Sequence, residues 1–296
     1  MELFRALAAL AEAPGPEQVR VIAALGLPEA PHPPEHTDLF SLQLYPYASV
    51  YVGAEGMLGG EARDRVAGFW RALRRVPPDE PDHLTVLLAF YAALAEHEGG
   101  EPDGARRLLW GQSRKALLWE HLASWLFTYL DKLSEIAPPF YRVWGNLLAE
   151  ALATEIGIVG HPDALPLHLR EAPPLLDPRC AGGEAFLRGL LAPVRSGIVL
   201  TRADLGRAAR DIGLGGRVGD RLFILRSLFA QDADGTLAWL EGEARGSIAK
   251  HLAHRGVSGG VAEFWAGRAE ATAALLTELQ REPASPGQEY GGPAGN

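Results

Sequence analysis

Apolar residues recur every three or four positions through most of the chain, which is the spacing of one face of an α-helix. In residues 61–75 they occupy positions i, i+3, i+4 and i+7, and charged side chains fill the positions between them. These apolar residues are Val66, Phe69, Trp70 and Leu73. Similar spacing predicts helices over residues 2–13, 16–25 and 140–156, and one long helix or a bent pair over 105–136.

Only one segment alternates between apolar and polar residues in the manner of a β-strand. It runs from Leu44 to Gly53, and no second segment alternates well enough to pair with it. We therefore expect an ordered loop there, with its tyrosines packed inward, and an all-α fold for the chain.

A stretch rich in proline and glycine, residues 157–183, separates the N-terminal helices from a second helical set. Beyond it, helices are predicted over residues 201–212, 218–230, 235–254 and 261–280. The expected organisation is a helical domain at 1–160, a linker or wrapped loop at 161–182, a helical C-terminal extension at 183–281 and a disordered tail at 282–296.

The stretch from Asp79 to Leu84 combines a helix-start signal with acids, a proline and a histidine. Asp79 is a favourable N-cap, Pro81 falls in the first turn, and Asp82 has the position of a capping-box acid. His83 then lies beside Asp82 at the mouth of the helix. Asp82 can act as a plain helix cap or contact a ligand, and both roles remain open.

Composition narrows the function classes. The chain carries 37 acidic and 28 basic residues, a net charge of −9, which argues against binding nucleic acid through its phosphates. The single cysteine, Cys180, excludes an internal disulfide framework and a cysteine-rich metal site. The N-terminus lacks the features of a secretory signal, and no apolar run reaches the roughly 18 residues that span a bilayer. We expect a cytoplasmic protein without membrane insertion.

Motifs for catalysis or metal binding are weak. His251 and His254 are three residues apart on a predicted helix, but no HExxH pattern accompanies them, so a solvated helix end is the preferred interpretation. No GxSxG motif or Cys–His pair supplies a nucleophile. The glycines from Gly213 to Gly219 miss the spacing of a dinucleotide fingerprint. We therefore expect no catalytic residue, metal or cofactor.

Residues 195–226 hold seven arginines against three aspartates. Two short predicted helices joined by a glycine turn, with that charge, have the form of a helix-turn-helix. A DNA-binding regulator is therefore the alternative hypothesis. A solvated arginine face, or a patch that docks an acidic partner, fits the negative charge of the whole chain better.

The N-terminal half resembles a known family. Tyr47-Ala48-Ser49-Val50-Tyr51 precedes a glycine loop and an amphipathic helix, and Glu80-Pro81-Asp82-His83-Leu84 then opens an apolar helix. This order is similar to the TorD/DmsD/NarJ family of cytoplasmic chaperones for molybdenum oxidoreductases. The acid-proline-x-Asp-His signature of that family is shortened here by one residue between proline and histidine. Trp119–Leu122 and Pro138–Tyr141 also fit the family, and the resemblance covers residues 1 to 160.

The resemblance implies a TorD-like helical bundle, extended at its C-terminus, with no catalysis of its own. It implies binding of the twin-arginine signal peptide or apo form of a molybdoenzyme catalytic subunit while the molybdopterin cofactor is inserted, before export or assembly. Such a receptor needs carboxylates beside an apolar groove, which Glu80 and Asp82 flank, while His83 holds the acid or senses the peptide. A monomer or a domain-swapped dimer is expected. The residues expected to contact the peptide are Tyr47, Ser49, Tyr51, Phe69, Trp70, Glu80, Pro81, Asp82, His83 and Leu84.

Overall fold

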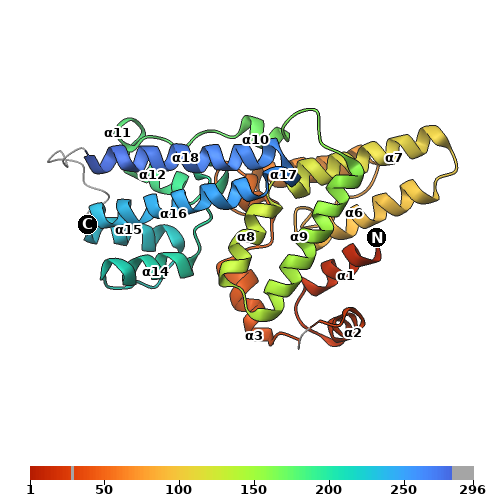
Figure 1. Ribbon diagram of the computed structural model, residues 1–296, viewed down its shortest axis with the longest axis horizontal. Helices are drawn as coiled ribbons and strands as arrows, with labels where there is room; N and C mark the ends of the chain where they lie inside the picture. The colour runs from red at the N-terminus through yellow and green to blue at the C-terminus, as the bar shows by residue number, and fades with distance from the viewer. Residues whose placement is uncertain (28–29, 282–296) are drawn as a thin grey trace. The chain divides into compact units, whose positions relative to one another are not determined.

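The computed structural model describes residues 1–27 and 30–281. Within these ranges every regular secondary-structure element is a helix (Figure 1). The predicted all-α fold class is confirmed. An isolated antiparallel bridge between Tyr47 and His83 is the one β-type pairing among these residues. The tail predicted to be disordered, 282–296, lies outside the described residues.

The chain divides into two compact units. The first consists of residues 1–53, 57–171 and 254–261, and the second of residues 54–56, 172–253 and those from Ala262 onward. No helix within the described ranges combines the length and the apolar character that crossing a membrane requires.

The helices of the first unit are α1 (Glu2–Leu10), α2 (Pro16–Leu25), α3 (Pro33–His36), the π-helix η1 (Thr37–Gln43), α4 (Ala48–Val52), α5 (Gly60–Ala72), α6 (Leu84–Gly100), α7 (Gly104–Ala116), the π-helix η2 (Leu117–Ala123), α8 (Leu126–Ile136), α9 (Pro139–Val159), α10 (Leu167–Glu171) and α17 (Arg255–Ser258). The segment predicted as a loop over residues 44–53 therefore contains a short helix, α4. The region predicted as one long helix or a bent pair, 105–136, consists of α7, the π-helix η2 and α8.

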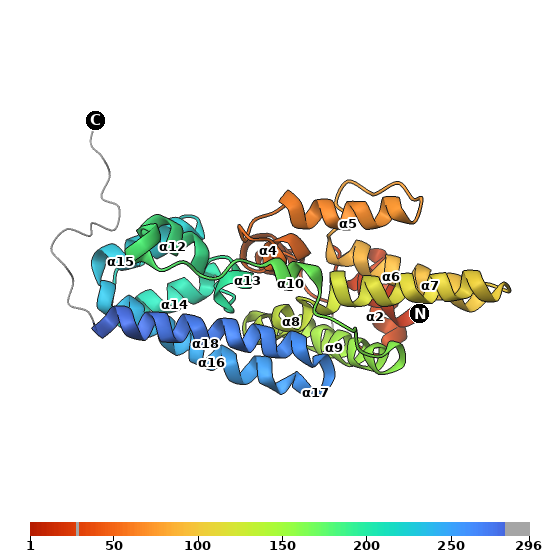
Figure 2. The ribbon, with the colours of Figure 1, turned by 90° about the horizontal axis from the view of Figure 1, so that it is seen from above.

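Apolar packing of α1, α6 and α9 forms the centre of the first unit, and α6 and α7 run side by side as a hairpin (Figures 1 and 2). Leu7, Tyr91 and Trp144 are fully buried there, because the helical spacing seen in the sequence places them on inward faces. The indole N–H of Trp144 donates to the backbone oxygen of Leu7 at 3.0 Å, which satisfies a polar group inside the core.

Helix α7 is held differently, because none of its side chains is buried. Arg114 of α7 reaches inward and donates to Glu155 of α9 at 3.0 Å and to Glu98 of α6 at 2.6 Å. The Tyr91 hydroxyl donates to the same Glu155 carboxylate at 2.7 Å. Nearly every charge in this network has an opposite charge beside it. The network attaches α7 to the rest of the unit, a role that a buried apolar face plays in the other helices.

The helices of the second unit are α11 (Pro178–Ala181), α12 (Gly183–Leu190), α13 (Pro193–Ser196), α14 (Arg202–Ile212), α15 (Arg221–Gln231), α16 (Ala233–Ala253) and most of α18 (Gly260–Arg281). Long helices α16 and α18 lie side by side (Figures 1 and 2). Residues from α12, α14, α15, α16 and α18 form one apolar core, with Phe186, Leu225 and Leu240 fully buried.

Two local signals explain how α14 is placed. Thr201 and Asp204 form a capping box: the Thr201 side chain accepts from the Asp204 N–H, and the Asp204 carboxylate accepts from the Thr201 N–H. Just before it, Gly197 has a φ of 72°, and a Cβ there would meet the Ala269 nitrogen at 2.3 Å. Only glycine allows the chain to pass α18 so closely.

Because two histidines of the first unit are buried, we expect the stability of that unit to fall in acid. Burial, together with the neighbouring Arg65 guanidinium, lowers the pKa of His121 to about 3 and that of His168 to about 4, while Glu61 and Glu171 partly oppose the effect at His168. An unfolded histidine titrates near 6.5, so the unfolded chain binds more protons than the folded chain between about pH 6.5 and 4. The stabilisation is complete above that window and is lost as the pH falls through it.

We expect the free energy of unfolding to fall by up to about 1.4 kcal/mol per pH unit for each histidine below pH 6.5. Urea denaturation at pH 7, 6 and 5 measures this. The double variant His121→Leu/His168→Leu should flatten the pH dependence, whereas His161→Gln, at an exposed position, should retain it. A wild-type chain equally stable at pH 7 and pH 5 would contradict the prediction.

Candidate functional site

The stretch around His83 pairs with the stretch around Tyr47 through its backbone. The Ala48 N–H donates to the Asp82 oxygen at 3.0 Å, and the Leu84 N–H donates to the Pro46 oxygen at 2.8 Å. These two bonds flank the Tyr47–His83 bridge, and the rings of those two residues meet edge to face with centroids 4.7 Å apart. The pairing joins two segments that are distant in sequence into one corner of the first unit.

This pairing corrects the predicted helix start. Helix α6 begins at Leu84 with His83 as its N-cap, so the prediction that Asp79 caps the helix and Asp82 completes a capping box is wrong. The physical reason is that the backbone groups of Asp82 and Leu84 are committed to the extended pairing with residues 46–48, which helical geometry does not allow. The His83 Nδ1 accepts the Thr85 N–H at 3.3 Å in the role of the cap.

The Asp82 carboxylate instead anchors the opposite segment. Its Oδ2 accepts the Ser49 N–H at 3.1 Å, and both residues are almost completely buried, with 1% and 0% of their surfaces exposed. The Ser49 hydroxyl oxygen in turn accepts the Gly59 N–H at 3.1 Å. Asp82 therefore holds α4 and, through Ser49, the loop that carries Leu58.

A pocket of about 430 Å³ opens beside this corner. Two predicted site residues, Tyr47 and His83, contribute to its wall. The pocket is lined by Ala11, Glu12, Ala13, His36, Phe40, Ser41, Tyr45, Pro46, Tyr47, Leu58 and His83. Its wall is thus largely aromatic and apolar, and Glu12 is its one formally charged group at neutral pH.

The protonation states of Tyr47 and His83 follow from their surroundings. Burial, together with the carboxylates of Glu80 and Asp82, raises the pKa of Tyr47 to about 12, so its hydroxyl keeps its proton. Burial lowers the pKa of His83, an effect that Glu80 and Asp82 oppose and His36 reinforces. Because Nδ1 of a neutral His83 accepts from Thr85, its proton is on Nε2. Both side chains are therefore hydrogen-bond donors at neutral pH.

A second pocket, also about 430 Å³, continues along α1 and shares Glu12 with the first. It is lined by Arg5, Ala8, Ala9, Glu12, Glu17, Gln18, Thr85 and Ala89. We call the two pockets together the α1 groove. Because His83 and Thr85 start the same helix, the groove runs directly past the corner.

The α1 groove carries two uncompensated acids. Arg5 forms an ion pair with Glu96, but neither Glu12 nor Glu17 has a hydrogen bond or ion pair from its carboxylate to a described residue. The Thr85 hydroxyl is also buried without a partner among the described residues. A groove that joins a largely apolar pocket to one with two uncompensated carboxylates is suited to a ligand that is both cationic and apolar.

The other predicted site residues do not line the α1 groove. Ser49, Tyr51, Pro81, Asp82 and Leu84 are buried beneath the corner, and the Tyr51 ring stacks on Trp125 with centroids 5.0 Å apart. Glu80 is exposed beside Tyr47.

Phe69 and Trp70 lie on α5 against Phe90, with the Trp70 and Phe90 rings stacked at 3.8 Å. The structure therefore divides the predicted set into two half-buried residues of the groove wall, one exposed acid beside them, five buried supports and a separate aromatic pair.

Sequence reasoning missed Glu12, Glu17 and His36 as groove residues. Glu12 follows α1 and Glu17 starts α2, so both resembled ordinary exposed acids at helix ends. His36 stood only as one of several histidines near prolines. No periodic signal links these positions to residue 83, because the connection is made by tertiary packing.

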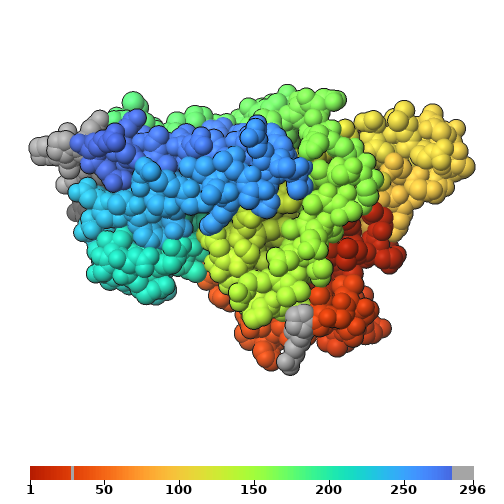
Figure 3. Space-filling model, in the orientation of Figure 1, coloured from red at the N-terminus to blue at the C-terminus, as the bar shows by residue number. Residues whose placement is uncertain are grey.

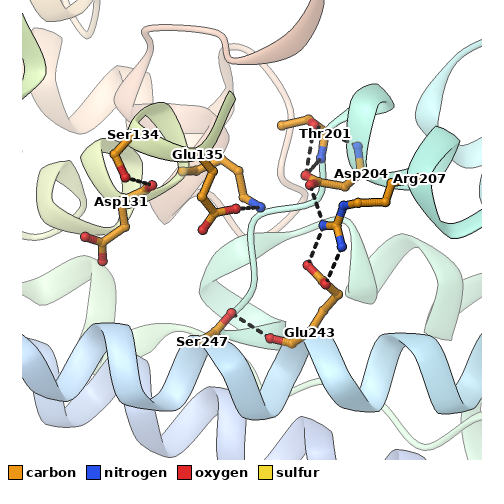
Figure 4. Close-up of polar contacts among 9 residues, drawn as sticks. Asp131, Ser134, Glu135, Thr201, Asp204, Arg207, Glu243 and Ser247 are labelled. Atoms are coloured by element: carbon orange, nitrogen blue, oxygen red, sulfur yellow. Dashed lines mark hydrogen bonds and ion pairs between the residues drawn. The ribbon is translucent and has the colours of Figure 1, made fainter. Parts of the chain in front are cut away.

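Four of the seven arginines in the basic cluster at 195–226 form hydrogen bonds or ion pairs within the second unit. Arg207 forms two hydrogen bonds with Glu243, at 2.9 and 3.0 Å, and one with Asp204 (Figure 4). Arg195 donates to the backbone oxygen of Ala54. Arg221 donates to the backbone oxygens of Leu200 and Gly56. Arg226 pairs with Glu184. Helix α15, which would be the recognition helix, thus offers no uncompensated arginine to DNA.

The two C-terminal histidines each have their own partner. His251 is buried, which corrects the expected solvated helix end, and its Nε2 lies 2.8 Å from the Gly197 oxygen. His254 lies 2.8 Å from Asp131. Among the described residues, no group of three or more His, Cys, Asp or Glu side chains is arranged to hold a metal.

Comparison with known proteins finds a similarity in the segment that contains the corner. Residues 33–130, about a third of the chain, match the family model described as nitrate reductase delta subunit. The predicted resemblance to TorD/DmsD/NarJ chaperones is confirmed. The delta-subunit family consists of maturation chaperones of molybdoenzymes, acts with the catalytic subunit of nitrate reductase and is not catalytic. No curated protein and no solved structure matches this chain.

The matched segment contains the corner, and the role of its aspartate is testable. Asp82→Ala leaves the buried Ser49 N–H without an acceptor, which should lower the free energy of unfolding by about 1–3 kcal/mol. Asp82→Asn keeps an acceptor oxygen and should recover much of the loss. Asp79→Ala, at an exposed position three residues earlier, should change stability by less than about 0.5 kcal/mol. Equal effects of Asp79→Ala and Asp82→Ala in urea denaturation would refute the anchoring role.

Proposed function

We propose that this chain is a maturation chaperone that binds the twin-arginine leader peptide of an apo molybdoenzyme catalytic subunit along the α1 groove. It acts in the cytoplasm, assists insertion of the molybdopterin cofactor before export or assembly, and catalyses no reaction itself. The observation that carries the proposal is the pair of free carboxylates, Glu12 and Glu17, beside the His83 corner of a segment that matches the delta-subunit family.

The chemistry of such a leader supports this choice. A leader presents two arginines followed by an apolar run, and guanidinium groups form their strongest hydrogen bonds with carboxylates. Glu12 and Glu17 are available for the arginines, and the pocket wall formed by Phe40, Tyr45 and Leu58 is available for the apolar run. The net charge of −9 adds a long-range attraction for a cationic peptide.

The predicted site residues take different roles in this proposal. Tyr47 and His83 contact the peptide, because they line the groove, and Glu80 does so as an exposed acid beside Tyr47. Asp82 and Ser49 position them without touching it, since both are sealed from solvent. Tyr51, Pro81 and Leu84 form the base beneath. Phe69 and Trp70 remain candidates only for a longer peptide, because they line neither pocket.

Fluorescence anisotropy with a synthetic twin-arginine leader tests the proposal. The double variant Glu12→Gln/Glu17→Gln should weaken binding by about tenfold or more, because each charge-assisted hydrogen bond contributes about 1.5–3 kcal/mol. His83→Ala should also weaken it. A twin-lysine version of the peptide should bind less tightly than the twin-arginine one, since lysine lacks the bidentate geometry.

Glu2→Gln is the matched control, because Glu2 is an exposed acid on α1 outside both pockets. Its affinity for the leader should equal that of the unmodified chain. The proposal fails if leaders of molybdoenzymes do not bind at tens of micromolar, or if Glu2→Gln weakens binding as much as the double variant does.

A further inference from the structure

The α6–α7 hairpin presents an apolar surface that the proposed function does not use. Leu108 and Leu109 of α7 are 65% and 66% exposed, and Ile158, near the end of α9, is 66% exposed. The space-filling view shows the hairpin projecting beyond the other helices of the first unit (Figure 3). These side chains gather on neighbouring elements, which makes this surface a candidate for a contact with a partner.

Two of these side chains belong to one groove of about 470 Å³. One wall is a single face of α7, at helical spacing: Gly104, Arg107, Leu108, Gly111, Gln112 and Lys115. The other wall is formed by Ile158 and Val159 at the end of α9, with Glu98 of α6 below. We call this the α7 groove; it shares no residue with the α1 groove.

The α7 groove is positively charged. Its carboxylate, Glu98, is compensated by Arg114 at 2.6 Å, and Arg114 is itself shared with Glu155. Arg107 and Lys115 have no hydrogen bond or ion pair from their side chains to any described residue, so their charges face outward uncompensated. A groove with two uncompensated cations beside exposed aliphatic side chains, on a chain with a net charge of −9, is complementary to a ligand that carries both acidic and aliphatic groups.

We propose that the α7 groove binds an amphipathic segment of a partner protein in which acidic side chains flank aliphatic ones. Arg107 and Lys115 are eight residues apart on a helix, which corresponds to about 12 Å. The partner therefore carries two carboxylates at about that separation, and aliphatic side chains between them pack on Leu108 and Ile158. This chemistry is opposite to that of a twin-arginine leader, so the groove is a second recognition surface.

Other occupants fit the groove less well. A cationic leader is repelled by Arg107 and Lys115. An anionic membrane surface is disfavoured because the site is a groove between two helices, into which a flat bilayer surface does not fit. A second copy of this chain remains the competing occupant, and the experiment distinguishes it.

Two fluorescent 18-residue peptides test the proposal with the full chain. They share a leucine face with helical spacing, and one is flanked by glutamates and the other by lysines. The glutamate peptide should bind and the lysine peptide should not. Arg107→Glu/Lys115→Glu should weaken binding of the glutamate peptide by about tenfold or more and reverse the preference, and Leu108→Ala/Ile158→Ala should weaken it with the preference unchanged.

The matched control is Arg202→Glu/Arg210→Glu, which reverses two arginines of α14 that also lack partners among the described residues. It should bind like the unmodified chain. All variants should bind the twin-arginine leader with unchanged affinity, which shows that they are folded and separates this proposal from the proposed function.

Three results of the peptide experiment would overturn the proposal: binding of neither peptide, equal binding of both, or a control variant that binds as weakly as Arg107→Glu/Lys115→Glu. The proposal also fails if the chain sediments with phosphatidylglycerol vesicles and the charge reversal abolishes that sedimentation. Concentration-dependent dimerisation in analytical ultracentrifugation, lost in Leu108→Ala/Ile158→Ala, would likewise overturn it by assigning the groove to a second copy.

Discussion

The bond between the Asp82 carboxylate and the Ser49 N–H is the constraint on which the candidate site depends. A carboxylate that is 1% exposed is costly to bury unless it is hydrogen-bonded, so this acid fixes the segment that satisfies it. With residues 46–48 paired to 82–84, helix α6 can only begin at Leu84, and His83 is left at its mouth. The relay from Ser49 to Gly59 then sets the loop that brings Leu58 to the pocket wall.

In the proposed function, one acid holds the fold and two others recognise the ligand. Asp82 is sealed, and its charge is used inside the fold, whereas Glu12 and Glu17 are exposed and uncompensated among the described residues. The division has a physical reason, because a carboxylate that must release its internal partner to bind a ligand loses as much as it gains. A short acidic motif can thus mark a binding region while its most buried member never meets the ligand.

The sequence predicted the helices well and their connections poorly. Helices such as α5, α9 and α14 carry their own signals: apolar spacing, a proline at the start of α9 and a capping box at Thr201. The predicted start of α6 was wrong because a strong local capping pattern was overridden by pairing with a distant segment, as in the bond from Leu84 to Pro46. Buried His251 and the acids Glu12 and Glu17 were missed for the same reason: tertiary partners decide their roles.

Opposite charges on the two grooves have a structural logic within the first unit. Helix α6 carries Thr85 and Ala89 of the α1 groove near its start and Glu98 of the α7 groove near its end. Ala89 and Glu98 are nine residues apart, which is about 14 Å along the helix. That separation is longer than the Debye length at physiological ionic strength, so the exposed charges of one groove are largely screened from those of the other. If both proposals hold, one helix presents two sites of opposite charge at a fixed spacing, and simultaneous binding of two parts of one client would be favoured over exchange between two ligands.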